Sequence, residues 1–477
     1  MKHLRSRLHL GALMTLALGA LAAPAVVVAQ DSTSTLHYKG LSISPIGFAA
    51  AELVWRQKNE EADIGSSYNA IPFSGTSAGN TSEFRMTGRQ SRIGLLAAGS
   101  ADDMKFSGYW EADFLGVGTT SNSTESNSYV LRVRQYFAQI GFNNGTTLDA
   151  GQMWSFVTTD KSGLLPRSEQ VPLTIEAQYA AGFNWARQAA FRATTKLGDE
   201  ASAGIALEGA QTTIGGRNIF GNVLLGQTGG SLLNGTANYS ADFAPDIIAK
   251  LAFDPKGAGH WEIKGLTSFF RDRVVDPATP ATTRNINSTG YGVGIGTFYP
   301  VMAGGRDVMD IGVSGLYGKG IGRYGTSGLP DVTIAADSSL APIKEAQGLL
   351  SIETHPTKML DVYGYAGAEY ADRTAFLVGA KGVGYGSVAG SNASGCGTEA
   401  APGGQYAPAS GTCNVDTRAI WQGNLGFWYR FYKGAGGTVQ WGMQYSYTSR
   451  NTWVDATGNQ PQAIENMLFS SFRYVLP

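Results

Sequence analysis

The 477-residue chain has few charged side chains and no excess of basic over acidic ones. Charged residues make up 15% of the sequence, with 36 Lys and Arg against 37 Asp and Glu, whereas a soluble domain carries about a quarter. The missing basic surplus argues against a nucleic-acid partner. Together with 64 Gly, 21 Tyr and 21 Phe, the low charge favours a strand-rich chain whose outer surface is not mostly in water.

Long apolar runs are missing after the N-terminus. A basic N-terminal segment is followed by one run, Leu10–Ala23, and by small residues up to Ala29. This order predicts a secretory signal peptide over residues 1–29, leaving 30–477 as a single domain. An anchor helix is the alternative, and the shortness of the run, which Pro24 interrupts, argues against it. Without another such run, a membrane-embedded chain must form a closed barrel.

Residues that commonly bind metals are scarce. Beyond the signal segment the histidines are His37, His260 and His355, and their spacing predicts no metal site and no cofactor. Cys396 and Cys413 flank a loop rich in Gly, Ala and Pro, and in an exported protein such a pair predicts a disulfide that pins the loop. A metal site at these cysteines is disfavoured because no histidine lies nearby.

Patterns typical of enzymes are weak. The stretch GTSAG at Gly75–Gly79 matches a nucleophile elbow but lies in a polar loop without the strand-to-helix context. Glu111 and Asp113 could form an acid/base pair, yet at this spacing on a strand they are more simply charges lining a pore. We therefore expect no enzymatic activity. The evenly spaced glycines 290, 292, 294 and 296 are expected to keep one strand face low, where the lumen or another backbone needs room.

Apolar and polar residues alternate along most of the chain and predict strands. The sixteen expected strands are 40–57, 83–99, 104–117, 127–142, 147–157, 180–197, 201–211, 243–255, 259–274, 285–301, 307–321, 345–354, 359–373, 417–433, 437–451 and 463–477.

The connections alternate between short links and long, Gly/Ser/Asn-rich ones. The expected long connections are 58–82, 118–126, 158–179, 212–242, 275–284, 322–344, 374–416 and 452–462. Regular alternation and an even strand number are typical of bacterial outer-membrane barrels, and soluble sandwiches lack them. The chain is therefore expected to be an all-β, 16-stranded antiparallel transmembrane barrel with short periplasmic turns and long outer loops.

The strands have one apolar and one polar face. The expected faces of the strand 127–142 are Leu131, Val133 and Phe137 on one side and Arg132, Arg134 and Tyr136 on the other. An arginine facing lipid at mid-depth would cost about 2–4 kcal/mol, so the charged face must meet water. On the same argument, Trp441, Met443 and Tyr445 are expected to face lipid or a neighbouring subunit.

The strand 83–99 breaks this alternation. Glu83, Arg85 and Arg89 share one face, but Arg92 falls on the other. A bulge near Gly88–Gln90 would restore the register, or the end of the strand protrudes above the membrane; both alternatives stay open.

Several motifs together resemble the trimeric general porins of Gram-negative outer membranes, and in particular the DcaP-like branch. The motifs are SRIG at 91–94, LRVRQYFAQIGF at 131–142, LDAGQMWSF at 148–156, ARQAAFR at 186–192, FWYRFYKG at 427–434 and SFRYVLP at 471–477.

The resemblance implies a third loop that folds into the barrel, with acids on the loop opposing arginines on the wall. The implied loop acids are Asp160, Glu169 and Glu176, and the wall candidates are Arg89, Arg92, Arg132, Arg134, Arg187 and Arg192, with Glu111 and Asp113 beside them. Such cations would attract anions into a narrow pore. Alternatively, the arginines pair with loop carboxylates and hold the loop in place.

The resemblance also implies a function and partners. We expect a porin in the outer membrane, a homotrimer surrounded by lipid, that admits small hydrophilic and possibly anionic solutes by passive diffusion. A binding or adhesion protein acting through the disulfide-pinned loop 374–416 is the alternative.

Overall fold

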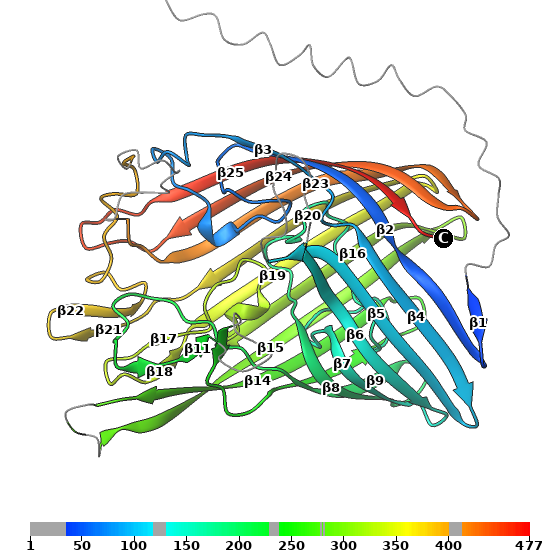
Figure 1. The fold of residues 1–477 in the computed structure, drawn as a ribbon, viewed down its shortest axis with the longest axis horizontal. Coiled ribbons are helices and arrows are strands. Elements are labelled where there is room, and N and C mark those ends of the chain that lie inside the picture. Colours follow the sequence, from blue (N-terminus) through cyan, green and yellow to red (C-terminus); the bar gives the residue numbers. More distant parts are fainter. Residues whose placement is uncertain (1–34, 118–129, 229–237, 277–278, 280–281, 400–412) are drawn as a thin grey trace, which may run out of the picture.

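The computed structural model describes residues 35–477 apart from 118–129, 229–237, 277–278, 280–281 and 400–412. The expected signal peptide lies outside these residues. The described chain is an antiparallel barrel closed by pairing of its first and last long strands (Figure 1). None of the described residues lies in a helix long and apolar enough to cross a membrane.

The barrel wall consists of long strands that pair with their sequence neighbours. They are β2 (Leu41–Arg56), β3 (Glu83–Thr87), β4 (Arg92–Ala101), β5 (Met104–Gly116), β6 (Val130–Phe142), β7 (Thr146–Trp154), β8 (Arg187–Lys196), β9 (Ala201–Glu208), β13 (Asp246–Phe253), β14 (His260–Val274), β15 (Arg284–Ala303), β16 (Arg306–Lys319), β19 (Lys344–Thr357), β20 (Leu360–Ala371), β23 (Thr417–Gly434), β24 (Gly437–Thr452) and β25 (Gln462–Val475). Because β3 and β4 both pair with β2 and form one interrupted strand, the wall has 16 strands, and the expected fold class is confirmed.

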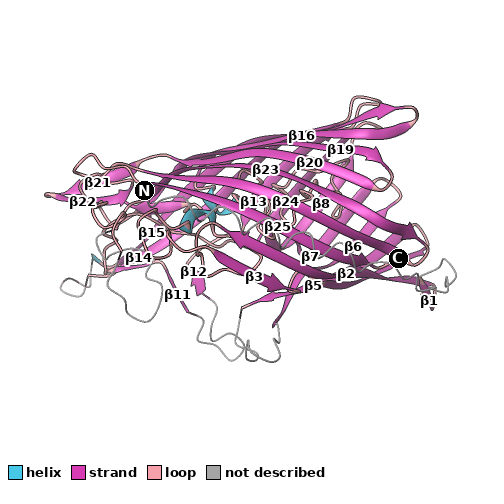
Figure 2. Ribbon diagram, turned by 90° about the horizontal axis from the view of Figure 1, so that it is seen from above, coloured by secondary structure: helices cyan, strands magenta, loops and turns pink. Residues whose placement is uncertain are grey.

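Short elements occupy the ends of the barrel. They are β1 (Leu36–Tyr38), β10 (Val223–Leu224), β11 (Gly226–Thr228), β12 (Asn238–Ser240), β17 (Val332–Ile334), β18 (Leu340–Pro342), β21 (Thr374–Val378), β22 (Lys381–Tyr385) and the 3-10 turns η1 (Tyr68–Ala70) and η3 (Gly322–Tyr324). The hairpins β17–β18 and β21–β22 gather with the long connections at one end, and the C-terminus lies at the end with the short turns (Figures 1 and 2).

A bulge interrupts the strand made of β3 and β4. Glu52 of β2 lies opposite Thr87, and Phe48 lies opposite Arg92. Residues 49–51 of β2 therefore face residues 88–91, which is one residue more. The extra residue is what restores the alternation, so the bulge interpretation of this region is correct.

A second bulge, in β6, overturns part of the expected face assignment. Arg134 is an extra residue between Val133 and Gln135, which pair with consecutive residues of β5. Beyond it the faces exchange, so Tyr136 is 58% exposed on the outside while Phe137 is only 5% exposed. The expectation that Tyr136 faces inward and Phe137 outward is wrong, because an inserted residue shifts the inward–outward alternation of the side chains that follow it.

The outward face of the barrel is largely apolar. In β24, Tyr445 is 46% exposed, whereas its neighbours Gln444 and Ser446 are buried inside. Other exposed apolar side chains on the wall strands include Ile93, Leu95, Leu131, Phe191, Ile205, Trp261, Ile263, Val293, Ile295, Trp421 and Leu425. The alternation along VQWGMQYSYTSR, residues Val439–Arg450, therefore places aromatic side chains outward and polar side chains inward.

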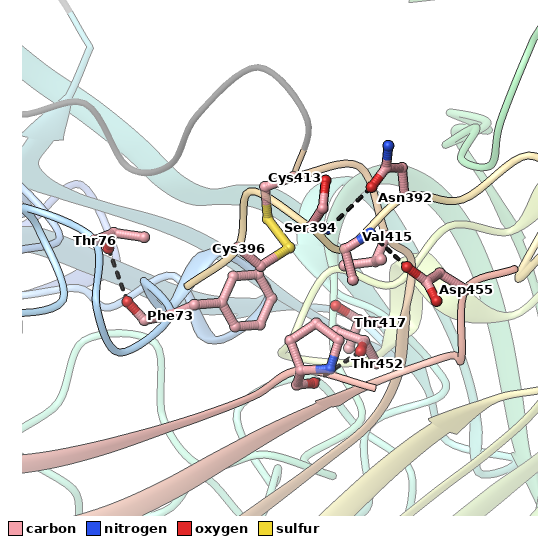
Figure 3. Close-up of a disulfide and its surroundings, with 12 residues drawn as sticks. Phe73, Thr76, Asn392, Ser394, Cys396, Cys413, Val415, Thr417, Thr452 and Asp455 are labelled. Atoms are coloured by element: carbon pink, nitrogen blue, oxygen red, sulfur yellow. Dashed lines mark hydrogen bonds between the residues drawn. A yellow bond between two sulfur atoms is a disulfide. The ribbon is translucent and has the colours of Figure 1, made fainter. Parts of the chain in front are cut away.

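The predicted disulfide joins Cys396 to Cys413. It belongs to an apolar cluster with Ile71 and Phe73 of the connection between β2 and β3, and Figure 3 shows the Phe73 ring beside it. Asp455, from another long connection, accepts a hydrogen bond of 2.8 Å from the Ala393 backbone N–H. The disulfide thus lies where three long connections contact one another.

Candidate functional site

The connection between β7 and β8, residues 155–186, runs through the inside of the barrel, and we call it the inner loop. The expected strands 147–157 and 180–197 are too long here, because β7 ends at Trp154 and β8 starts at Arg187. The loop's backbone donates to polar side chains of the far wall: Leu173 N–H to the Tyr365 hydroxyl (2.7 Å) and Ile175 N–H to Gln444 Oε1 (2.6 Å). These side chains satisfy backbone donors that burial would otherwise leave unpaired.

Glycines on the wall make room for the inner loop. A Cβ atom at Gly296 of β15 would lie 2.5 Å from Thr159 Oγ1 of the loop. At the adjacent Gly294, a Cβ would lie 3.0 Å from the Lys264 side chain, whose Nζ donates to the Val157 carbonyl (2.5 Å). As expected, the glycines keep one face of β15 free of side chains, and at Gly296 the inner loop residue Thr159 occupies the space.

Arginines and acids from β4, β5, β6 and β8 meet near the C-terminal part of the inner loop. We call this group the arginine cluster; its members are Arg92, Arg132, Arg134, Arg187, Glu111, Asp113 and Tyr179. The structure thereby brings together four of the six predicted arginines and two of the five predicted acids.

Arg134 is the centre of the arginine cluster. Its guanidinium donates to Glu111 Oε1 (2.6 Å), to Asp113 Oδ2 (3.0 Å) and to the Tyr179 hydroxyl (3.1 Å). Arg132 donates to both oxygens of Asp113, at 2.9 and 2.7 Å. Because the β6 bulge lies at Arg134, this residue and Arg132 can both point to the same two acids of β5.

Tyr179 links the inner loop to two of these arginines. Its hydroxyl accepts a second hydrogen bond, from Arg187 Nη1 (3.2 Å). Its backbone has a φ of 69°, which is uncommon for a residue other than glycine and is characteristic of sites that the surrounding structure holds in place. Arg187 also stacks on the rings of Trp154 and Trp185, at 4.9 and 4.7 Å.

The arginine cluster has more positive than negative charge. Four guanidinium groups face two carboxylates, while Arg92 Nη1 lies 3.5 Å from Glu111. Arg473 of β25 lies close to Arg92, because β25 and β4 both pair with β2 and both arginines stack on the Phe48 ring. Arg473 also pairs with Glu52 (2.7 Å) and stacks on Trp428. A cavity of about 330 Å³ lies between the loop and this wall. Besides apolar and neutral polar side chains it is lined by arginines and by carboxylates, namely Arg92, Arg134, Arg430, Arg473, Glu111, Asp113, Glu176 and Asp361.

The other two predicted arginines serve different parts of the barrel. Arg89 donates to the backbone carbonyls of Phe114 (3.0 Å) and Gly116 (2.8 Å). Arg192 donates to the Trp154 carbonyl (2.7 Å) and stacks on the Phe156 ring. Both stabilise backbone at strand or loop ends, and Arg89 also forms an ion pair with Asp63 (3.3 Å).

Two of the three inner-loop acids have direct partners outside the arginine cluster. Asp160 pairs with Lys250 of β13 (2.9 Å), which also donates to Glu262 (3.1 Å). Glu176 accepts bonds from the Ser66 N–H (3.0 Å) and hydroxyl (2.6 Å). The direct ion pairs of Arg132 and Arg134 are with acids of β5, while Glu176 lines the same cavity as Arg92 and Arg134. The expected opposition of loop acids to wall arginines stays a prediction.

Glu169 lies beside Asp160 in an isolated bridge within the inner loop. Burial, reinforced by the negative charge of Asp160, raises the pKa of Glu169 to about 7. Among the described residues no cationic side chain forms an ion pair with Glu169, and this is consistent with its raised pKa.

Sequence reasoning missed several residues of the site. Tyr179 was not considered because a tyrosine in a loop has no pattern that distinguishes it. Lys250 of β13 faces inward, but its pairing with Asp160 joins residues 90 positions apart and has no sequence signal. Arg473 lies in the SFRYVLP motif, and only the closure of β25 onto β2 brings it to the site.

Comparisons with known proteins bear on the fold. No protein-family model and no curated protein matches the chain. The outer-membrane channel DcaP of Acinetobacter baumannii superposes with a TM-score of 0.60 at 17% identity, covering 92% of this chain and 99% of that one. OmpF of Salmonella typhi gives 0.49 at 10% identity, covering 93% and 100%, and OmpT of Vibrio cholerae 0.46 at 10%, covering 92% and 99%. The superposition on the DcaP channel, which covers 92% of this chain, shows that the chain has a porin-type barrel fold.

Proposed function

We propose that the protein is an outer-membrane porin that lets small hydrophilic solutes diffuse passively and favours anions at its constriction. The observation that carries this proposal is the arginine cluster, where four guanidinium groups face two carboxylates beside the inner loop. Cations along a narrow, partly desolvated path lower the energy of a passing anion and raise that of a passing cation.

The outer surface supports placement in a membrane. A band of exposed aliphatic and aromatic side chains covers the wall strands, while charged side chains such as Lys250, Glu262 and Asp310 point inward and are buried. In water this arrangement would expose a large apolar area at high cost, whereas lipid or a neighbouring subunit would cover it. We propose a homotrimer in the outer membrane, with lipid on the remaining surface.

The proposal is tested by the reversal potential of the purified protein in a planar bilayer under a salt gradient. Wild-type protein should conduct with an anion-selective reversal potential. Arg92→Gln and Arg187→Gln should move the potential toward cation selectivity, and Asp113→Asn should move it the other way. Arg306→Gln, at an exposed turn, is the matched control and should leave the potential unchanged.

The outcomes separate the two parts of the proposal. A folded barrel without conductance would contradict the porin function. If the protein conducts but none of the three substitutions changes its ion selectivity, the porin function stands and the arginine cluster is not the selective constriction.

A further inference from the structure

Three side chains suited to a metal ion meet on the inner wall at the end of the barrel with the short turns. They are Asp307 and Asp310 of β16 and His355 of β19. One donor atom from each lies within 4.8 Å of the other two. Among the described residues this is the one such group of three, and histidine spacing along the chain gives no sign of it because its members lie on two strands.

A third β-bulge builds this arrangement. Asp307 pairs with Met302 and Met309 pairs with Val301, so Val308 has no counterpart on β15. In a regular strand, residues three apart point to opposite faces. The inserted residue cancels this alternation and turns Asp307 and Asp310 to the same side, as bulges at binding sites commonly do.

The carboxylates lack partners for two of their oxygens. Asp310 is 5% exposed, and neither its Oδ1 nor the buried Oδ1 of Asp307 receives a hydrogen bond from another described residue, while the two carboxyl groups lie within hydrogen-bonding reach of each other. Two neighbouring carboxylates with unpaired oxygens repel each other and are costly to bury. A cation bound between them would remove both costs.

The histidine is oriented toward these carboxylates by a second layer of contacts. Its Nδ1 lies 2.9 Å from Asp361 Oδ1, and its Nε2 lies 3.4 Å from Asp310 Oδ2. Asp361 is itself held by an ion pair with Arg430. A carboxylate that accepts the Nδ1 proton leaves Nε2 free to bind a metal, which is the usual second layer around a metal-bound histidine.

A second histidine on the same wall provides the contrast. His260 also lies between two carboxylates, Asp254 (2.8 Å) and Glu262 (3.2 Å). However, Lys250 and Lys264 lie 3.1 and 2.9 Å from Glu262 and already supply its counter-charge. The His355 group has unpaired oxygens where the His260 group has lysines.

We propose that Asp307, Asp310 and His355 bind one divalent transition-metal ion on the lumen wall. Two carboxylates and one imidazole suit ions such as Zn²⁺ better than Mg²⁺ or Ca²⁺, which prefer oxygen ligands throughout. Zn²⁺ bonds to these groups are about 2.0–2.2 Å long, so side-chain rotations would close the observed spacing around one ion. The remaining positions would be taken by water in the lumen.

The test uses full-length mature protein without a histidine tag, in detergent, titrated with ZnCl₂ in a calorimeter. Wild-type protein should bind one Zn²⁺ per chain. Asp310→Asn and His355→Gln should weaken binding by more than about 10-fold, and Asp361→Asn should weaken it by about 10-fold. His260→Gln is the matched control and should bind as the wild type does.

Folding of each variant is verified by its heat-dependent shift in gel mobility, so that loss of binding is not confused with loss of the barrel. Stoichiometric binding that Asp310→Asn and His355→Gln abolish supports the site. Folded wild-type protein that binds no Zn²⁺ overturns the proposal, and so does binding that survives both substitutions or that falls equally with His260→Gln. In that case His355 is a charged bridge between Asp310 and Asp361.

Discussion

Arg134 of β6 and Tyr179 of the inner loop are joined by a hydrogen bond of 3.1 Å between Nη2 and the phenolic oxygen. Through this bond the wall residue that collects both acids of β5 also holds the loop that narrows the barrel. The same oxygen accepts from Arg187, so one hydroxyl joins two strands to the loop.

Replacing Tyr179 with Phe should loosen the inner loop. Two buried guanidinium groups would each lose an acceptor, and an unsatisfied buried donor costs about 1–3 kcal/mol. We expect a lower unfolding temperature and larger fluctuations of single-channel current. Tyr445→Phe removes an outward-facing phenol and serves as the control; an equal effect of the two substitutions would show that the hydroxyl of Tyr179 does not secure the loop.

Replacing Lys250 with Met should release the beginning of the inner loop. The substitution leaves Asp160 buried without its cation, and breaking one partner of a buried ion pair costs about 3–5 kcal/mol. Limited proteolysis of detergent-solubilised protein should then cleave within residues 155–186, and the conductance should rise. Lys256→Met, at an exposed turn, should change neither property, and resistance of the Lys250 variant to proteolysis would contradict the anchoring role.

The stability of the protein should depend on pH through Glu169. Its pKa is raised to about 7 in the folded chain, so the carboxyl keeps its proton there after it has lost it in the unfolded chain. The resulting stabilisation is complete below about pH 4.5 and is lost as pH rises through about 7. Between pH 5 and 8 the unfolding temperature should therefore fall more in the wild type than in Glu169→Gln.

The control for this experiment is Glu61→Gln, at an exposed loop position, which should keep the wild-type pH dependence. Identical pH profiles for the wild type and the Glu169 variant would show that this carboxyl is not the titrating group.

Removing the disulfide with Cys396→Ser and Cys413→Ser should leave the pore intact. The bond closes a loop with a sequence separation of 17 residues, and cross-links of that length stabilise by about 3 kcal/mol in the chain-entropy model. Because the disulfide contacts other long connections rather than the arginine cluster, conductance and selectivity should match the wild type while outer loops become more sensitive to protease. Altered selectivity would show that these loops control the path.

Alternation and connection length were enough to predict the barrel, because both follow from the local demand that one face meets lipid and the other water. Prediction of the inward and outward faces from alternation fails at β-bulges. At 88–91 the conflict between Arg89 and Arg92 indicated an irregularity, and the register with β2 decided for a bulge over a protruding strand end. At Arg134 nothing in the sequence indicated an irregularity, so Tyr136 and Phe137 were assigned to the wrong faces.

Which charged side chains pair with each other was harder to predict from the sequence. Six arginines were expected to share one site, but only register and barrel closure decide which of them meet. Arg132 and Arg134 pair with Glu111 and Asp113 because β5 and β6 are neighbours, whereas Asp160 of the inner loop pairs with Lys250 of β13, 90 positions away in the chain. Long-range contacts of this kind are determined by the shape of the whole barrel and have no local sequence signal.

The far anchors of the inner loop have a consequence for the order in which the protein assembles. The hydrogen bond from Ile175 to Gln444 joins residues 269 positions apart, and Gln444 is presented by β24 only after the last strands have been added. A chain still inserting its C-terminal strands has no surface on which to seat this part of the loop. This part of the inner loop can therefore reach its final position only once β24 is in place, whereas the strands that hold Asp160 and Tyr179 come earlier in the chain.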